Sequence, residues 1–239
     1  MSEPIAAITG GAGALGSALA ELLVERGYRV ALFDIEKSRA RAEEIASRLG
    51  KERVVVHTGD FGTAETWTAA LQSTKRTFGA YPQYAALVAG GWAGGESIHA
   101  AKDDSAYERM VKLNVDTVYR ALRALLPSMV EAKQGSIVVV GSRAVDRPWT
   151  SAGAAAYAAS KAAVVTMAET VAAEVLQDGV RINSVLPSTM DTAANRSAMP
   201  DADPKKWVAL SSAAAVIAFL FSDDSRDVSG AALPVYGRV

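Results

Sequence analysis

The sequence predicts an α/β fold in which a parallel sheet of about seven strands is flanked by helices on both faces. Two observations predict it. Short apolar runs, typical of buried strands, alternate with longer amphipathic stretches, and this rhythm continues from residue 5 to residue 236. Such alternation gives parallel strands joined by right-handed crossovers, hence a doubly wound sheet. Because ligands bind outside the carboxyl ends of these strands, we expect functional residues directly after each strand.

The individual elements follow from the same patterns. Strands are predicted at residues 5–9, 29–34, 53–57, 84–89, 136–140, 181–186 and 233–236. Helices are predicted at residues 14–26, 37–49, 63–78, 104–131 and 154–177. The longest irregular segment is 187–204, and long irregular segments in compact domains are usually functional. We therefore expect a substrate loop at about residues 187–206.

Length and composition indicate a globular chain. With 239 residues, 50% apolar and 21% charged, the sequence predicts a single domain over residues 1–239. Its 25 basic and 26 acidic residues give a net charge of -1 without a basic run, so neither a nucleic-acid nor a membrane partner is expected. The apolar stretch 5–8 is too short for a signal peptide or a spanning helix, and we expect a cytoplasmic protein.

Cysteine and histidine usage bears on other chemistries. The sequence contains no cysteine, which excludes disulfides, thiolate metal sites and cysteine nucleophiles. His57 and His99 lie far apart in the sequence and outside any carboxylate cluster with metal-ligand spacing. We expect ordinary strand-end and loop roles for both histidines, and no metal.

A glycine-rich turn joins the first predicted strand to the first helix. Three of its glycines satisfy the GxGxxG spacing, in which the backbone turns tightly and approaches a pyrophosphate at a helix N-terminus. A tight strand-to-helix turn without a ligand is the alternative, but the surrounding strand and helix favour a dinucleotide site of the Rossmann type. The candidate residues are Gly10, Gly11, Gly13, Ala14, Leu15 and Gly16.

Two carboxylates follow the next strands. Asp34 ends the second strand, where a carboxylate accepts hydrogen bonds from a ribose diol and repels a 2′-phosphate, so we expect NAD (NADH) rather than NADP. A helix cap or a solvated charge is the alternative, and Lys37 and Arg39 leave some NADP use open. Asp60, which precedes Phe61, is positioned to reach an adenine amino group or to serve as an ordinary turn residue.

Tyr157 and Lys161 are spaced i and i+4 on a predicted helix, and therefore share one face. A nearby cation lowers the pKa of a tyrosine, and such a phenol can protonate a carbonyl oxygen or take a hydroxyl proton. The lysine is also placed to hold a nicotinamide ribose. Alone, the pair is equally consistent with a surface aromatic and a solvated lysine, and it gains weight beside the glycine turn.

Together these features resemble the short-chain dehydrogenase/reductase family, over residues 5–239. The resemblance implies that Ser142, which follows the strand 136–140, orients the substrate oxygen, and that Asn114 belongs to a proton relay. With Tyr157 and Lys161 these residues complete the catalytic tetrad of the family. For Ser142 the alternative is a strand-end hydrogen bond. The family usually forms dimers or tetramers, so we expect a homodimer or homotetramer.

The resemblance also implies further cofactor contacts, with departures from the family pattern. Ala89 and Gly90 stand where an Asn-Asn-Ala-Gly motif is usual, and Ala14 replaces the second glycine of the TGxxxGxG pattern. The segment 187–192 resembles PGxxxT, with Ser188 in place of glycine, and implies cofactor contacts from Pro187, Met190 and Thr192.

Two segments, 88–95 and 191–203, resemble the quinonoid dihydropteridine reductase branch of the family. There the substrate is a planar pterin, which Trp92 could flank. The candidate substrate-binding residues are Trp92, Ser142, Tyr157, Ser188 and Asn195. Dihydropteridine reductases usually lack the catalytic serine, whereas Ser142 is retained here, as in ketone reductases and alcohol dehydrogenases.

The leading hypothesis is thus an NAD(H)-dependent enzyme that transfers hydride between nicotinamide and a small carbonyl or alcohol, with a pterin as the alternative acceptor. A hypothesis from another class is a dinucleotide-binding sensor that transmits redox state to a partner protein. The intact set of four polar residues favours the enzyme.

Overall fold

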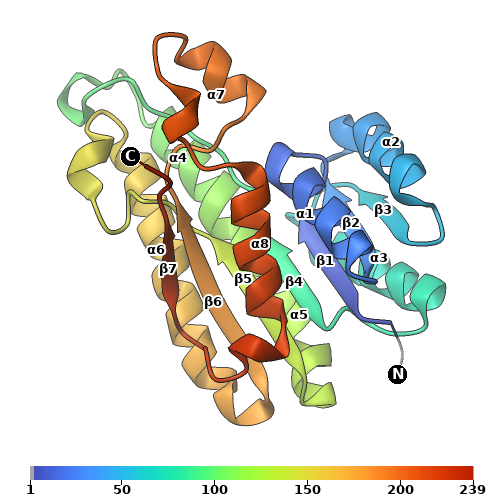
Figure 1. The fold of residues 1–239 in the computed structure, drawn as a ribbon. Coiled ribbons are helices and arrows are strands. Elements are labelled where there is room, and N and C mark those ends of the chain that lie inside the picture. Colours follow the sequence, from blue (N-terminus) through green and yellow to red (C-terminus); the bar gives the residue numbers. More distant parts are fainter. Residues whose placement is uncertain (1–2, 239) are drawn as a thin grey trace.

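The computed structural model describes residues 3–238, which build one seven-stranded parallel sheet in the order β3-β2-β1-β4-β5-β6-β7 (Figure 1). The strands are β1 (Ile5–Thr9), β2 (Arg29–Asp34), β3 (Val54–Thr58), β4 (Tyr84–Leu87), β5 (Gly135–Val140), β6 (Val180–Pro187) and β7 (Ala232–Val235). The order reverses direction between β1 and β4, so their carboxyl ends flank the point where doubly wound sheets bind ligands. The predicted fold class is confirmed.

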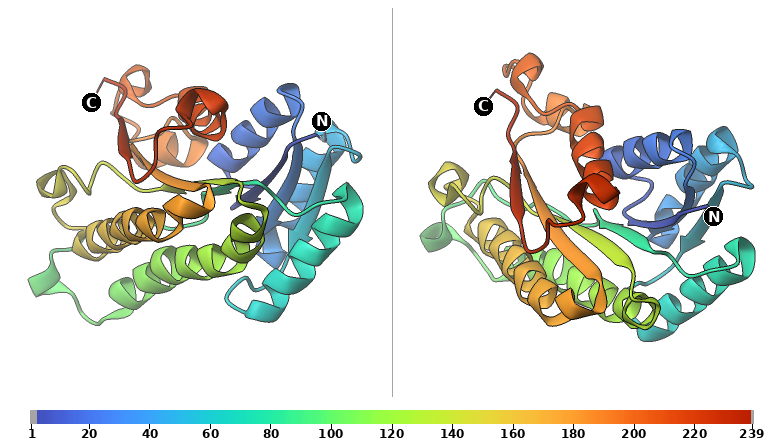
Figure 2. Two further views of the ribbon diagram at one scale, coloured as in Figure 1. Left: turned by 90° about the horizontal axis from the view of Figure 1, so that it is seen from below. Right: turned by 60° about the horizontal axis from the view of Figure 1, so that its bottom comes forward.

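Helices cover both faces of the sheet (Figure 2). On one face lie α1 (Ala14–Glu25), α2 (Arg39–Leu49) and α8 (Leu210–Phe221). On the other lie α3 (Ala64–Phe78), α5 (Thr117–Ala132) and α6 (Ala155–Val175). The short helices α4 (Ser105–Met110) and α7 (Ala193–Ala198) precede α5 and α8.

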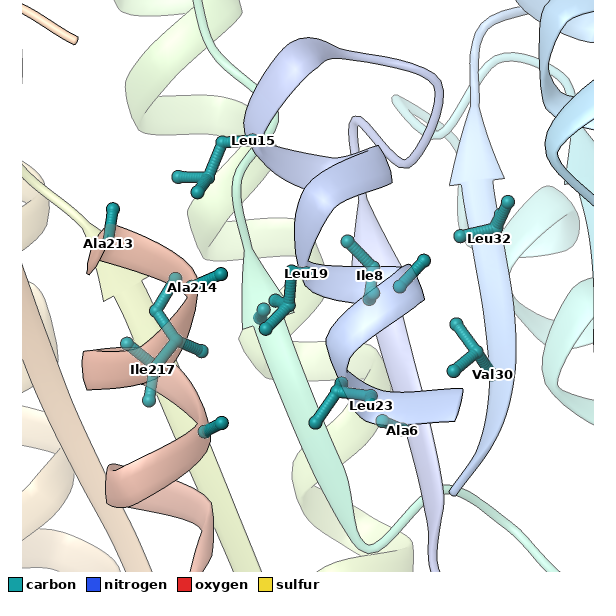
Figure 3. Close-up of a cluster of buried hydrophobic side chains, with 14 of the residues drawn as sticks. Ala6, Ile8, Leu15, Leu19, Leu23, Val30, Leu32, Ala213, Ala214 and Ile217 are labelled. Carbon is teal, nitrogen blue, oxygen red and sulfur yellow. The ribbon is translucent and has the colours of Figure 1, made fainter. Parts of the chain in front are cut away.

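The core is divided by the sheet, because successive strand residues point to opposite faces. In β1, Ala6 and Ile8 pack under α1 and α8, whereas Ala7 packs with α3, α5 and α6. Figure 3 shows the first of these clusters, where Leu19 and Leu23 of α1 and Ile217 of α8 meet over the strands. Both strand faces are buried, which explains the unbroken apolar runs in the sequence.

The structure corrects several predicted boundaries. The helix predicted at 104–131 is three elements, α4, a π-helical turn at Val111–Asp116 and α5. The segment predicted as irregular at 187–204 contains α7, and a 3₁₀ turn follows at Pro204–Lys206. Most strand ends shift by one or two residues, which is ordinary for sequence patterns.

Helix α8 is missing from the sequence prediction. Its sequence is apolar on nearly every side and carries no side-chain cap at its start, so neither an amphipathic pattern nor a capping residue marks it. It is held at its C-terminal end by Arg181 of β6, whose guanidinium donates to the carbonyl oxygens of Leu220, Ser222 and Val228. These bonds satisfy carbonyls that a helix end leaves free.

Among the helices of residues 3–238, none combines the length and the apolar character needed to cross a membrane. Within the same residues, no three His, Asp or Glu side chains are grouped so that they could hold a metal ion. His57 lies at the end of β3, where its Nε2 is 3.0 Å from Thr74 Oγ1.

Candidate active site

The glycine turn between β1 and α1 forms a bare backbone surface at the carboxyl edge of the sheet. Gly10 has φ +64°, which favours glycine. A Cβ on Gly16 would collide with the backbone of Gly10 and Gly11. Helix α1 begins after Gly13 with no side-chain cap and no acidic residue in its first turn. Its first amides and the positive end of its dipole therefore suit a phosphate, which is the fit that a dinucleotide requires.

Asp34, at the end of β2, is tied to this turn. Its Oδ2 accepts a hydrogen bond from the Ala12 amide at 2.9 Å, and its Oδ1 accepts one from the Ile35 amide at 2.8 Å. The carboxylate is therefore neither a helix cap nor a free solvated charge. It fixes the glycine turn against β2 and retains lone pairs for further donors.

Asp60 and Phe61 follow β3 at the same edge. Asp60 Oδ1 accepts a hydrogen bond from the Gly62 amide at 2.8 Å, which is the turn role considered for it. The ring of Phe61 packs against Phe33 and Trp67, and its carbonyl accepts from the Trp67 indole at 3.0 Å. The side chain of Phe61 thus belongs to the core, which leaves its backbone for any cofactor contact.

Tyr157 lies in the first turn of α6, close to Ser142 after β5. Burial raises the pKa of the Tyr157 phenol, and hydrogen bonding with the Ser142 side chain acts in the opposite direction. The expectation that Lys161 lowers the pKa of Tyr157 is wrong for this structure, because desolvation dominates and Lys161 is not among the groups that shift it. Ser142 also accepts from the Ala144 amide at 3.2 Å.

Lys161 lies one turn after Tyr157 on α6 and is buried, with 7% of its surface exposed. Its Nζ donates to the carbonyl oxygen of Val140, the last residue of β5, at 2.8 Å. Desolvation lowers the pKa of the ammonium to about 8. An ammonium has three donors, so two remain for other partners at this edge. The alternative of a solvated lysine is excluded by this burial.

Asn114 lies in the π-helical turn between α4 and α5, a rare geometry that is frequent at functional sites. Its amide Nδ2 donates to Ser160 Oγ at 2.8 Å and to the Gly91 carbonyl at 3.2 Å, and its Oδ1 accepts from the Gly91 amide at 2.8 Å. A Cβ on Gly90 would lie 2.7 Å from Asn114 Oδ1 and 3.4 Å from Lys161 Nζ. Asn114 and Lys161 therefore flank the same glycine.

The segment after β4 is fixed at two points around Trp92. Gly91 is held by Asn114, and the Gly95 amide donates to the Gly153 carbonyl at 2.9 Å. A Cβ on Gly94 would be within 2.8 Å of the Trp92 ring and 2.7 Å of the Ala154 side chain. Trp92 nevertheless remains 59% exposed. The indole is thus a surface placed beside the start of α6, where Tyr157 lies.

The segment after β6 is internally bonded. Ser188 Oγ donates to the Tyr236 carbonyl at 2.7 Å, and the Pro187 carbonyl accepts from the Arg143 amide at 2.9 Å. Thr192 caps α7, and Asn195 Nδ2 donates to the Met190 carbonyl at 2.8 Å. The side-chain amide of Asn195 therefore stabilises the backbone of this loop, independently of any substrate contact.

The structure brings one part of the predicted set of residues together. Four polar residues lie around Gly90 and the start of α6, namely Asn114, Ser142, Tyr157 and Lys161. The glycine turn lies beside them, because the amide of Ala89, which precedes Gly90, donates to Thr9 Oγ1 at 3.1 Å. Sequence reasoning missed Ser160, the hydrogen-bond partner of Asn114, although it directly precedes Lys161 in the motif. It also missed Gly91, whose role depends on backbone groups that no residue type reveals.

Comparison with known proteins decides the family. A model described as short chain dehydrogenase matches residues 4–203. The chain belongs to this family. This family consists of oxidoreductases. The resemblance found in the sequence is confirmed at this level.

Relatives within the family are distant but cover nearly the whole chain. The chain is 30% identical over 253 residues to 2-(S)-hydroxypropyl-CoM dehydrogenase 3 of Xanthobacter autotrophicus, with 99% of this chain and 96% of the relative covered. It is 28% identical over 248 residues to 2,5-dichloro-2,5-cyclohexadiene-1,4-diol dehydrogenase of Sphingobium indicum, with the same coverage. The structure of a 3-oxoacyl-[acyl-carrier protein] reductase with bound NAD from Brucella melitensis has a TM-score of 0.86 at 25% identity, and covers 100% of this chain and 91% of its own.

Proposed function

We propose that this chain is an NAD(H)-dependent enzyme that transfers hydride between nicotinamide and a carbonyl or alcohol, with Tyr157 as the general acid and base. The observation that carries the proposal is the convergence of Asn114, Ser142, Tyr157 and Lys161 beside a bare glycine turn. The relatives named above are dehydrogenases and a reductase, and one is described with NAD.

The roles of the four side chains follow from their surroundings. A bound nicotinamide would supply or accept the hydride. Tyr157 stays protonated at neutral pH because burial raises its pKa, so its phenol donates a proton to a substrate oxygen in the reductive direction. Ser142 donates to the same oxygen and orients it. Lys161 holds a cation behind the site and stabilises negative charge that develops on Tyr157 in the oxidative direction.

The NAD preference is proposed from Asp34. Its carboxylate stands at the end of β2 next to the glycine turn, where its free lone pairs are able to accept from a ribose diol. A 2′-phosphate at that place would face a full negative charge. The residues proposed to contact the other end of the cofactor are Pro187, Met190 and Thr192 in a substrate loop at about 187–206.

Asp34→Asn is expected to weaken NADH binding and to improve NADPH binding relative to it. The amide keeps one acceptor for Ala12 but loses the charge, so the repulsion of a 2′-phosphate disappears. We expect the ratio of the two dissociation constants to shift by about tenfold toward NADPH, the size of one charged hydrogen bond. Titration of nicotinamide fluorescence measures both constants. A wild-type chain that already prefers NADPH would contradict the role given to Asp34.

A pterin is the second candidate substrate, and the observation that favours it is Trp92. The indole is exposed, and the backbone on either side of it is fixed, at Gly91 by Asn114 and at Gly95 by the Gly153 carbonyl. A flat aromatic surface of this kind stacks on a planar ring. The retained Ser142, in turn, favours a ketone or alcohol.

An NADH-oxidation assay that compares quinonoid dihydropterin with a set of linear and cyclic ketones tests the proposal and separates the two candidates. We expect turnover with at least one carbonyl and slower turnover with the pterin. A faster rate with the pterin would make it the substrate. Cofactor binding without turnover on any acceptor would favour a sensor.

A further inference from the structure

A second carboxylate shares the edge of the sheet at which Asp34 lies. Glu36, in the 3₁₀ turn Glu36–Ser38 after β2, accepts from Arg39 Nε at 2.6 Å and from Arg39 Nη2 at 2.8 Å. This two-pronged pairing is the strong form of a carboxylate–guanidinium contact. Glu36 Oε2 also accepts from Thr58 Oγ1 at 2.8 Å. One carboxylate thus binds the first residue of α2 and the last residue of β3.

The position of Thr58 places this pair beside Asp34. Thr58 is the register partner of Asp34 in the β2–β3 ladder, and the Gly59 amide donates to the Asp34 carbonyl at 3.1 Å. The Glu36 carboxylate, anchored on Thr58, therefore lies over the carboxyl ends of β2 and β3. This is the edge where Asp34 is proposed to bind the adenosine ribose.

Arg39 is the cation that pairs with the Glu36 carboxylate, and its charge is matched by two carboxylates. Besides Glu36, it faces Glu43 one turn along α2, with 3.7 Å between Nη1 and Oε1. Hydrogen bonds from Arg39 and Thr58 lower the pKa of Glu36 to about 2, so the carboxylate stays ionised at every pH at which the protein would work. In enzymes that use NADP, an arginine near this place receives the 2′-phosphate.

We propose that Glu36 is a specificity-determining residue of the cofactor site, because it holds the Arg39 guanidinium in an ion pair and so withholds it from a 2′-phosphate. Two separate interactions then disfavour NADPH. The Asp34 carboxylate repels the 2′-phosphate, and Glu36 forms an ion pair with the arginine that would otherwise bind this phosphate. The inference rests on the proposed function, since it presupposes that a dinucleotide binds at the glycine turn.

The test measures binding, not turnover. Dissociation constants for NADH and NADPH are determined by fluorescence titration for the wild type and for Glu36→Gln, Arg39→Ala and the double variant Glu36→Gln/Arg39→Ala. Glutamine keeps the size of Glu36 and an acceptor for Thr58 but releases Arg39. The two side chains of this ion pair are 46% and 64% exposed, so we expect Glu36→Gln to tighten NADPH binding about threefold, the size of an exposed ion pair, and to leave NADH binding unchanged.

The double variant assigns the cause. Arg39→Ala alone should leave NADPH binding unchanged, because the paired arginine does not reach the phosphate, and it should abolish the gain when combined with Glu36→Gln. Glu21→Gln is the matched control, since it releases Arg48 from an exposed ion pair of 2.8 Å between α1 and α2 and should alter neither constant.

Three results would decide against the proposal. An unchanged NADPH constant in Glu36→Gln overturns it. A gain that survives in the double variant also overturns it, because loss of repulsion from Glu36 would then explain the effect without Arg39. A wild-type chain that binds neither nucleotide refutes the proposed function itself, and with it this inference, whereas NADH binding with no gain in Glu36→Gln refutes the inference alone.

Discussion

Tyr157→Phe is expected to lower kcat by about a thousandfold or more while NADH binding stays within about twofold of the wild type. Phenylalanine keeps the ring that packs at the start of α6 and removes only the hydroxyl that exchanges the proton. Desolvation keeps this phenol protonated at neutral pH, which is the form that the proton transfer requires. Steady-state rates of NADH oxidation, with fluorescence titration of NADH, measure both quantities.

Tyr107→Phe is the matched control for this variant. Tyr107 lies on α4 and is 59% exposed, so loss of its hydroxyl should change neither quantity. Near-wild-type turnover of Tyr157→Phe would remove the assignment of the acid. Equal losses in both variants would point to a general effect on folding.

Lys161→Met is expected to abolish turnover and at the same time to stabilise the chain in the absence of cofactor. Burial lowers the pKa of Lys161 from 10.5 to about 8, which corresponds to a folding cost on the order of 3 kcal/mol at neutral pH. Methionine removes that cost but leaves the Val140 carbonyl without its donor, which returns about 1–2 kcal/mol. Because the desolvation cost exceeds the worth of the lost hydrogen bond, the free energy of unfolding should rise.

The pH dependence of this gain has a definite sign. Below pH 8 the lysine is protonated in both the folded and the unfolded chain, so the wild type carries the whole cost. Between pH 8 and 10.5 the unfolded chain binds more protons than the folded one, and the stability of the wild type rises with pH from this group. The advantage of Lys161→Met should shrink across that window.

Urea unfolding of the wild type and of Lys161→Met, each at pH 7 and pH 10, measures the difference in their free energies of unfolding. Lys133→Met is the control, because Lys133 is an exposed residue at the C-terminal end of α5 whose replacement should give no comparable change with pH. A Lys161→Met chain that is less stable than the wild type at pH 7, or an advantage that does not vary with pH, would contradict the buried-cation account.

The sheet could be predicted from the sequence because its strands are buried on both faces and so appear as unbroken apolar runs. Helix α8, by contrast, was not predicted from the sequence. Its run Leu210–Phe221 is apolar and begins without a side-chain cap, so no capping residue marks its start. The π-helical turn at Val111–Asp116 has no pattern in the sequence, and its residue Asn114 bonds with Gly91 and Ser160, which are distant in the chain.

The candidate site could be predicted in its residues but not in its electrostatics. Spacing alone placed Tyr157 and Lys161 on one helix face, and a charge beside a phenol suggested a lowered pKa. The structure instead buries Lys161 and half-buries Tyr157, and desolvation raises the pKa of Tyr157 and lowers that of Lys161. Burial is a property of the packed chain, and no motif reports it. The hydrogen bonds of Asp34 with Ala12 and of Glu36 with Arg39 also depend on the folded structure, and no sequence motif predicts them.

The central claim is that this chain moves a hydride from nicotinamide to a substrate carbon while Tyr157 supplies the proton. The most direct test is to incubate the chain with NADH deuterated at C4, on the transferred face, and with the carbonyl that gives the fastest NADH oxidation, and to analyse the alcohol by mass spectrometry. We predict one deuterium on the carbinol carbon, with product formation nearly lost in Tyr157→Phe. Product without deuterium on that carbon, or unchanged product formation in Tyr157→Phe, would contradict the account.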